Sequence, residues 1–279
     1  MSEIGFYLPT PDRSTSGEEL VAIESFRLGL ISHGETVFAY QHGERCQQQN
    51  AVMFGWGKLR NNEVCKNQLT IGGKVLGINF GAVRRDRGYY VAGWNGPSNL
   101  GQYYNEKSNS DRWDVLDLHT TPWGWWKGSK IILACQVPTD GSVQSIDIID
   151  WCRRATLEIR RYTDREIIFR PHPLAREITP SIPGTTRSER SFQEDLHEAW
   201  AVVTYNSTSS GLAVLEGVPV FSLNEQSFAW GVSSHELSQI ENPARPNRWQ
   251  WACDLAYVQW TLEEMRSGLA WDHLKRGAV

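Results

Sequence analysis

The feature that most constrains the fold is an alternation of short apolar runs and amphipathic segments through the second half of the chain. The apolar runs have the length and composition of buried strands and lie at 130–137, 166–169, 201–205 and 218–223. The segments between them are predicted to be helical and cover 146–162, 192–200 and 211–216. Strands that alternate with helices pair in parallel, so this pattern predicts a doubly wound α/β domain.

The first half of the chain shows the same alternation less clearly. Strand-like runs lie at 4–8, 36–40, 51–54 and 75–79, and a helix is expected at 18–32. The segment 81–128 is rich in Gly, Asn, Trp and Tyr, which predicts loops and short strands that end in a linker. We therefore predict two domains, residues 1–125 and residues 126–279, with the mainly helical segment 249–274 in the second.

Composition and charge limit the class of protein. The 279 residues are 40% hydrophobic and 22% charged with a net charge of -4, which is typical of a globular protein without an overall basic surface. No apolar run approaches the roughly 18 residues of a membrane span, and a secretory signal is not expected. The five cysteines are scattered without a CxxC pair, which favours free thiols, a cytoplasmic location and no metal site.

Polar residues follow the strand at 166–169 directly, in the sequence RPHP. Ligands bind at the carboxyl ends of strands in open α/β sheets. The prolines on both sides of His172 restrict its backbone, and Arg170 and His172 can both donate hydrogen bonds to phosphate oxygens. The motif therefore indicates an anion site, with a strand-ending turn around a structural histidine as the alternative.

A second polar run, NSTSSG, stands between the strand at 201–205 and a helix. Hydroxyls and backbone N–H groups at a helix N-terminus favour an anion. The hydroxyls belong to Ser207, Thr208, Ser209 and Ser210. Glu216 follows about a turn and a half later and is a candidate for contact with a ribose diol or a base edge. The alternative is a helix cap of small polar residues with a surface glutamate.

A third run, QVPTDGS, also leaves a strand, and its Gln136 and Asp140 are candidates for contacts to a base or a sugar. A plain turn is the alternative. The chain contains no G-x-x-x-x-G-K-[ST] loop, no GxGxxG after the first strand and no G-x-S-x-G. These absences disfavour a P-loop NTPase, a standard dinucleotide fold and an α/β-hydrolase.

Taken as a set, RPHP and the Ser/Thr run with its downstream glutamate resemble the HP and serine motifs of nucleotide-sugar glycosyltransferases of the GT-B type. The pattern is most similar to that of bacterial capsule Kdo-transferases and polysialyltransferases, and ILACQVPTDGSV resembles the segment that opens their donor domain. INFGAVRRDRGYY resembles their acidic segment, but Asn79 stands where that family carries an acidic residue. The ending LAYVQWTLEEMRSGLAWDHL is similar to small DNA-modifying glycosyltransferases of tailed phages.

The resemblance implies two Rossmann-like domains that face each other, an acceptor-side domain first and a donor-binding domain second. It implies a metal-independent transferase with no cofactor other than a nucleotide-sugar co-substrate, of UDP or CMP type. His172 would contact the donor phosphates with Arg170 nearby. The segment from Ser207 to Ser210 would hold the same phosphates, and Glu216 would bind the ribose.

The general base of such a transferase is expected in the N-terminal half. Asp86 is the first candidate, and Asp12 and Glu18 are weaker ones. Each of them has the alternative of an ordinary surface carboxylate.

Two clusters bear on the acceptor. The first combines basic and aromatic residues, which can hold phosphates and stack bases, and consists of Arg84, Arg85, Arg87, Tyr89 and Tyr90. The second, which can stack on sugar faces, consists of Trp123, Trp125 and Trp126. A solvated loop and a packed junction are the alternatives.

The favoured acceptor is a hydroxymethylated base in phage DNA, which would place the protein in the host cytoplasm. The alternatives are a capsule or surface-glycan transferase and a non-catalytic nucleotide-sugar-binding module, which Asn79 favours.

Overall fold

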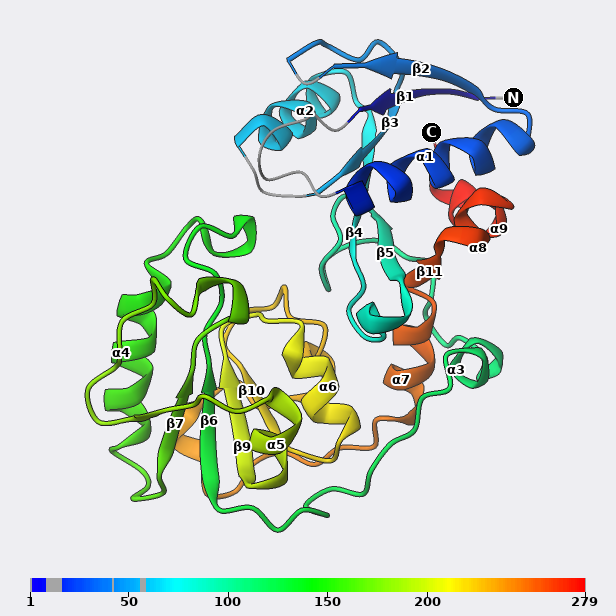
Figure 1. Cartoon of the computed structure of the whole chain (residues 1–279). Helices are drawn as coiled ribbons and strands as arrows, with labels where there is room; N and C mark the ends of the chain where they lie inside the picture. Colours follow the sequence, from blue (N-terminus) through cyan, green and yellow to red (C-terminus); the bar gives the residue numbers. More distant parts are fainter. Residues whose placement is uncertain (1, 9–16, 42, 56–58, 279) are drawn as a thin grey trace. The chain divides into compact units, whose positions relative to one another are not determined.

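A computed structural model describes residues 2–8, 17–41, 43–55 and 59–278 (Figure 1). The chain forms two compact units. Unit 1 combines residues 1–112 with residues 253–279, and unit 2 covers residues 113–252. The predicted division at residue 125 differs from this at both junctions, because the chain leaves unit 1 earlier and later returns to it.

Unit 1 is built on a sheet whose described strands have the order β11-β5-β4-β3-β1-β2. The parallel strands are β1 (Glu3–Tyr7), β2 (Thr36–Tyr40), β3 (Asn50–Phe54) and β4 (Lys74–Phe80). β5 (Tyr89–Trp94) is antiparallel to β4, and β11 (Gln259–Thr261) is antiparallel to β5. The strands expected at 4–8, 36–40, 51–54 and 75–79 are confirmed, whereas β5 and β11 were not individually predicted.

Helices cover both faces of this sheet. α1 (Gly17–Ser32), α8 (Leu262–Arg266) and α9 (Leu269–Leu274) enclose a core that includes Phe26, Trp94 and Trp271. α2 (Leu59–Thr70) lies on the other face, where Val64 packs into a cluster with Met53. Among the residues that the structure describes, no helix combines the length and apolar character needed to cross a membrane.

The C-terminal segment belongs to unit 1, which corrects the prediction of a terminal helix in the second domain. β11 hydrogen-bonds to β5. The buried Arg112 donates to Glu264 at 2.8 Å and to the Gln259 carbonyl oxygen at 2.8 Å, and its guanidinium lies 4.0 Å from the Trp260 ring centroid. A helical apolar pattern does not reveal which core the helix packs against, so only these distant contacts decide the assignment.

Unit 2 is reached through α3 (Asp111–Val115) and left through α7 (Trp249–Ala256). Its described strands form a fully parallel sheet in the order β10-β9-β6-β7-β8. The strands are β6 (Lys130–Ala134), β7 (Ile167–Arg170), β8 (Thr186–Arg187), β9 (Ala199–Thr204) and β10 (Val220–Ser222). This arrangement confirms the predicted doubly wound α/β domain.

The two faces of the unit 2 sheet are covered by different helices (Figure 1). α4 (Ile148–Ile159) packs on one face with Ile131 and Leu133 of β6. α5 (Phe192–His197) and α6 (Ser209–Leu215) pack on the other face with Ile132 and Ala134. Because successive strand residues point to opposite faces, one apolar run supplies both cores.

The start of α4 shows how local sequence sets these boundaries. The Asp147 side chain accepts hydrogen bonds from the backbone N–H groups of Ile149 at 2.9 Å and Asp150 at 3.0 Å. An aspartate cap of this kind satisfies N–H groups that have no partner within the helix. The predicted helix at 146–162 is therefore confirmed, with its beginning fixed by Asp147.

Candidate functional site

The loops singled out in the sequence emerge together at one edge of the unit 2 sheet, because all its strands are parallel. We call this the carboxyl edge, and define it by the ends of β6, β7, β9 and β10. Gln136 follows β6, His172 follows β7 and Ser207 follows β9. The chain leaves β6 toward β7 on one side and leaves β9 toward β10 on the other, so a topological switch point lies between β6 and β9. Ligands of open α/β sheets bind at such points.

A cluster of buried amides occupies the switch point. Gln136 and Asn206 are 6% and 8% exposed. The Gln136 Nε2 group donates to Asn206 Oδ1 at 2.5 Å, and the Asn206 backbone N–H donates to Gln136 Oε1 at 3.3 Å. Asn206 Nδ2 is within hydrogen-bond distance of Asn224 Oδ1 at 3.4 Å and Gln226 Oε1 at 3.2 Å. The cluster therefore joins the loops after β6, β9 and β10 through neutral hydrogen-bonding groups.

Sequence reasoning missed Asn224 and Gln226. Both stand directly after the apolar run VPVFSL, in the sequence NEQS, so they share with Gln136 the position just beyond a strand. Polar residues at every strand exit were the available signal. Which of these exits adjoin one another depends on strand order, which the sequence pattern does not supply.

His172 lies in a fixed loop between its two prolines. Its backbone is extended, with φ -64° and ψ 137°, as expected for a residue before proline. The Nδ1 atom accepts a hydrogen bond from the Leu174 backbone N–H at 3.2 Å. In the neutral imidazole the proton then resides on Nε2, which makes Nε2 the donor. A half-buried donor at the carboxyl edge suits an anionic ligand.

Arg170 has a different place from the one expected for a phosphate-binding cation. Its guanidinium donates to Asp195 Oδ2 at 2.8 Å and to the Arg190 carbonyl oxygen at 2.6 Å, and both side chains of the ion pair are buried. In β7, Arg170 points to the same face as Ile168, the face that α5 covers. A cation on that face needs a buried partner, and Asp195 of α5 provides it. The structure thus makes Arg170 a support for the His172 loop, with its charge already matched.

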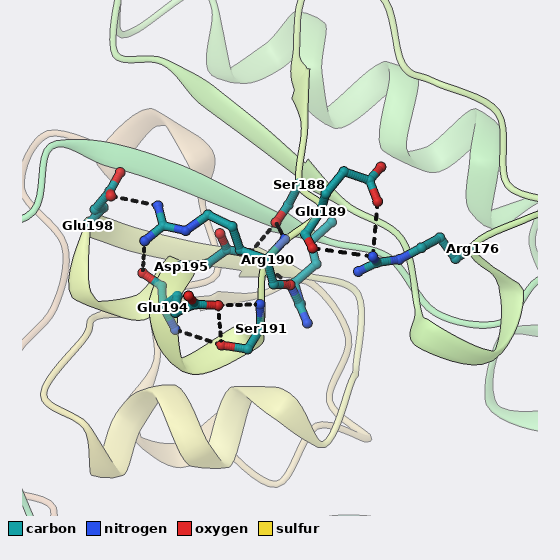
Figure 2. Close-up of polar contacts among 9 residues, drawn as sticks. Arg176, Ser188, Glu189, Arg190, Ser191, Glu194, Asp195 and Glu198 are labelled. Carbon is teal, nitrogen blue, oxygen red and sulfur yellow. Dashed lines mark hydrogen bonds and ion pairs between the residues drawn. The ribbon is translucent and has the colours of Figure 1, made fainter.

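Polar contacts tie the segment after β8 to its surroundings (Figure 2). Ser188 Oγ donates to Asp195 at 2.7 Å, and Ser191 with Glu194 forms a capping box at the start of α5. Arg190 pairs with Glu198 at 2.6 Å. Hydrogen bonds from Lys130 and Arg190 lower the pKa of Glu198 to about 2. Most charged groups of this segment are thereby neutralised by neighbours within unit 2.

The serine run divides into two parts. Ser207 and Ser209 are half-buried with their hydroxyls 2.9 Å apart, and Thr208 is exposed. Ser210 is fully buried, and its hydroxyl lies 2.9 Å from that of Ser227. The structure therefore leaves three hydroxyls of the run for a ligand, and it assigns Ser210 to the core.

Glu216 does not lie with the serine run. α6 has seven residues and is therefore about 10 Å long, and it runs from the carboxyl edge toward the opposite edge. Glu216 caps its C-terminal end, where Glu216 Oε2 lies 3.5 Å from Thr121 Oγ1. Glu216 and the serine run therefore lie at opposite ends of the helix, and the contact of Glu216 with a ribose stays a prediction.

Asp140 remains at the carboxyl edge in an exposed turn. Its side chain accepts from the Ser142 backbone N–H at 2.8 Å and from Ser142 Oγ at 2.6 Å. Ser142 in turn accepts from Gln136 Nε2 at 3.0 Å. Asp140 thus orders the loop that carries Gln136, and its contact with a ligand stays a prediction.

Candidate base residues lie in unit 1. Asp86 is exposed in the 3-10 turn η1 (Arg85–Arg87), in the loop that follows the carboxyl end of β4. Glu18 is exposed in the first turn of α1, and Asp12 lies outside the described residues. Within the described part of the chain, no group of three or more His, Cys, Asp or Glu residues is arranged to hold a metal ion.

The basic and aromatic cluster expected near Asp86 is only partly exposed. Tyr89 and Tyr90 are 7% and 6% exposed, because both lie in β5 within the sheet. Burial also raises the pKa of Tyr89. The prediction that these rings stack bases is therefore corrected, since neither ring offers a free face of the required size.

No family model matches the chain, and no curated protein matches it in sequence. Two solved structures share its fold. The β-Kdo 2,7-transferase of Thermosulfurimonas dismutans KpsC has a TM-score of 0.55 and 16% identity, over 96% of this chain and 98% of that chain. The β-Kdo 2,4-transferase of the same KpsC has a TM-score of 0.54 and 12% identity, over 91% and 90%. This likeness confirms a mixed α/β fold of the GT-B type, with a fully parallel sheet in unit 2 and a mainly parallel sheet in unit 1.

Proposed function

We propose that the protein transfers a sugar from a nucleotide-sugar donor to a hydroxyl group of an acceptor. The observation that carries the proposal is the meeting of the loops after β6, β9 and β10 at the switch point of the unit 2 sheet, with the loop after β7 at the same edge. The fold that the chain shares with two Kdo transferases supports the same activity.

In this proposal the carboxyl edge binds the donor. His172 Nε2–H and the hydroxyls of Ser207, Thr208 and Ser209 donate hydrogen bonds to the phosphate and stabilise its charge as it leaves the sugar. The amide cluster around Gln136 offers neutral donors and acceptors that suit the edge of a nucleobase.

The charge of the carboxyl edge favours a donor with one phosphate. In the loops 135–147, 171–185, 205–208 and 223–236, Arg176 is the single Lys or Arg. Arg176 is already paired with Glu189 at 3.0 Å. A nucleoside diphosphate leaving group carries more charge than a monophosphate and needs more cationic compensation. We therefore favour a CMP-type donor over a UDP-type donor.

The acceptor is proposed to be a glycan hydroxyl. The burial of Tyr89 and Tyr90 removes the aromatic surface on which a DNA acceptor would stack, so a hydroxymethylated base is the second candidate. Asp86, exposed at the carboxyl end of β4, is the proposed general base that removes the acceptor proton.

A binding experiment tests the donor first. CMP, UDP, GDP and ADP would be added to the purified chain while its melting temperature is followed, since a ligand of the folded state raises that temperature. We expect CMP to give the largest rise, and His172→Ala to lose it. His119→Ala, which changes an exposed histidine of the same unit, is the matched control. If CMP raises the melting temperature of His172→Ala as much as that of His119→Ala, His172 does not contact the nucleotide.

A transfer experiment then separates an enzyme from a binding module. The chain would be incubated with CMP-Kdo and either acidic or neutral oligosaccharides, or with DNA that contains hydroxymethylated bases. We expect product with an oligosaccharide, and a loss on the order of 10²-fold for Asp86→Asn against Glu106→Gln as control. CMP binding without product on any acceptor would establish the non-catalytic alternative.

A further inference from the structure

A second candidate site lies at the edge of the unit 2 sheet where β6, β9 and β10 begin, opposite the carboxyl edge. A hollow of about 380 Å³ opens there. We call it the tryptophan hollow and define it by Trp123, Trp126, Lys127, Trp200, Pro219 and Arg245. Its volume lies within the range of about 300–1,000 Å³ that small-molecule sites occupy.

The three indole rings of the hollow are held in place. The Trp126 ring stacks on His197 with 3.9 Å between centroids. The indole N–H groups of Trp126, Trp200 and Trp123 donate to the backbone carbonyl oxygens of Glu216 at 3.0 Å, Ile240 at 2.7 Å and Pro246 at 2.9 Å. Because their polar groups are satisfied, the rings present aromatic carbon to the hollow in fixed positions, which lowers the entropy lost when a ligand binds.

Two glycines allow the chain to build this surface. A Cβ atom at Gly128 would lie 2.3 Å from a backbone carbon of Glu198. A Cβ atom at Gly217, whose φ is +75°, would lie 2.3 Å from the Pro122 carbonyl oxygen. The segment that carries Trp123 and Trp126 therefore packs directly against the backbone at the start of β9 and before β10.

The charged residues that line the hollow are cationic. Lys127 and Arg245 line it, and none of its lining residues carries a carboxylate. Within the described part of the chain neither cation forms an ion pair, and the Arg245 guanidinium lies 5.3 Å from the Trp200 ring centroid. Arg248 does not line the hollow, but its guanidinium lies 3.9 Å from the ring centroid of Trp123, which does.

Arg248 itself lacks a compensating anion. It is 7% exposed, and its Nη1 group has no hydrogen-bond partner within the described part of the chain. Burial lowers the pKa of Arg248 to about 10. Its Nη2 group donates to the Thr121 carbonyl oxygen, which is neutral. Buried charges are normally paired with an opposite charge, so this guanidinium beside Trp123 adds to the attraction of the region for an anion.

We propose that the tryptophan hollow binds an acidic saccharide. The C–H faces of a pyranose ring pack on the indole rings, and the sugar carboxylate meets Lys127 and Arg245. A nucleic acid strand would need a track of cations along successive phosphates, whereas the hollow offers two lining cations. This site is distinct from the proposed donor site, because the two lie at opposite edges of one sheet.

The test uses trigalacturonate as the acidic probe and maltotriose as the neutral one, with binding to the full chain measured by calorimetry. We expect trigalacturonate to bind more tightly than maltotriose. The double change Lys127→Gln with Arg245→Gln should weaken trigalacturonate binding about tenfold or more, because two charge-assisted contacts are lost. Both side chains are exposed, so the variant should keep the melting temperature of the parent.

Two controls locate the site. Trp125 is 61% exposed beside the hollow without lining it, so Trp125→Ala should keep the affinity for trigalacturonate. His172→Ala should keep it too, because His172 lies at the other edge. Hexathymidylate serves as a nucleic acid probe. The proposal is overturned if the double variant binds trigalacturonate as tightly as the parent, or if His172→Ala loses this binding. It is also overturned if the parent binds hexathymidylate more tightly than trigalacturonate. None of these results depends on whether the carboxyl edge binds CMP.

Discussion

The two edges of the unit 2 sheet differ in chemistry although the same strands form both. At the carboxyl edge the polar groups include hydroxyls, amides, His172 and carboxylates such as Asp140, and the single arginine of the four loops is paired with Glu189. At the opposite edge, three tryptophans line a hollow with Lys127 and Arg245.

The direction of the helices explains this difference. α4 and α6 begin at the carboxyl edge, where the positive ends of their dipoles favour an anion, and they end at the other edge, where the negative ends of their dipoles favour cations. Cations are therefore dispensable at the first edge and complementary to the helix ends at the second. Under the two proposals, dipoles and hydroxyls would bind an anion at one edge and permanent charge would bind it at the other.

The largest expected effect comes from removing the support of the carboxyl edge. Asp195→Ala would leave the Arg170 guanidinium buried without a partner, so the free energy of unfolding should fall by about 3–5 kcal/mol. Urea denaturation measures this. The double change Arg170→Met with Asp195→Leu should restore much of the loss, because an apolar pair needs no charge compensation. A double variant as unstable as Asp195→Ala would mean that the ion pair is not the cause.

His172→Ala should separate the two edges functionally. Loss of one donor to a leaving phosphate is expected to lower kcat on the order of 10²-fold, which is about 2.7 kcal/mol. Steady-state kinetics with a CMP-linked sugar measures the change, with His119→Ala alongside. A rate like that of His119→Ala would show that RPHP is only a turn.

Two adjacent serines offer a matched pair within the carboxyl edge. Ser209→Ala should weaken donor binding about tenfold and leave unfolding unchanged, because its hydroxyl lies in the half-buried part of the run. Ser210→Ala should instead lower the free energy of unfolding by about 1 kcal/mol without affecting the donor, because its hydroxyl bonds to Ser227 in the core. The reverse assignment of the two effects would contradict the division of the serine run.

The smallest effect concerns Glu198, the carboxylate that immediately precedes β9. Its pKa is lowered to about 2, so its contribution to stability is complete above its ordinary pKa of 4.5 and is lost as the pH falls toward 2. Glu198→Gln should therefore flatten the fall of melting temperature with pH in this interval. Because the ion pairs of Glu198 are exposed to solvent, 1 M salt should reduce the difference in melting temperature between the parent and Glu198→Gln. If the melting temperatures of the parent and of Glu198→Gln fall equally with pH at low salt, Lys130 and Arg190 do not stabilise the ionised Glu198 carboxylate.

The sequence by itself determined the elements that depend on local periodicity. The helix at 146–162, the strand at 166–169 and the polar strand exits at His172 and Ser207 all follow from apolar spacing and from proline and serine chemistry. In a parallel α/β domain these exits share one edge whatever the strand order is, so the location of the candidate donor site was also predictable.

Only the tertiary structure decided how distant segments meet. Strand order placed Asn224 next to Asn206, and the side of β7 on which α5 packs gave Arg170 its partner Asp195. The return of β11 to unit 1 and the assembly of the tryptophan hollow from four separate segments likewise depend on contacts between remote residues. Local periodicity carries no information about these pairings, because it fixes which face of an element is apolar and leaves open what covers that face.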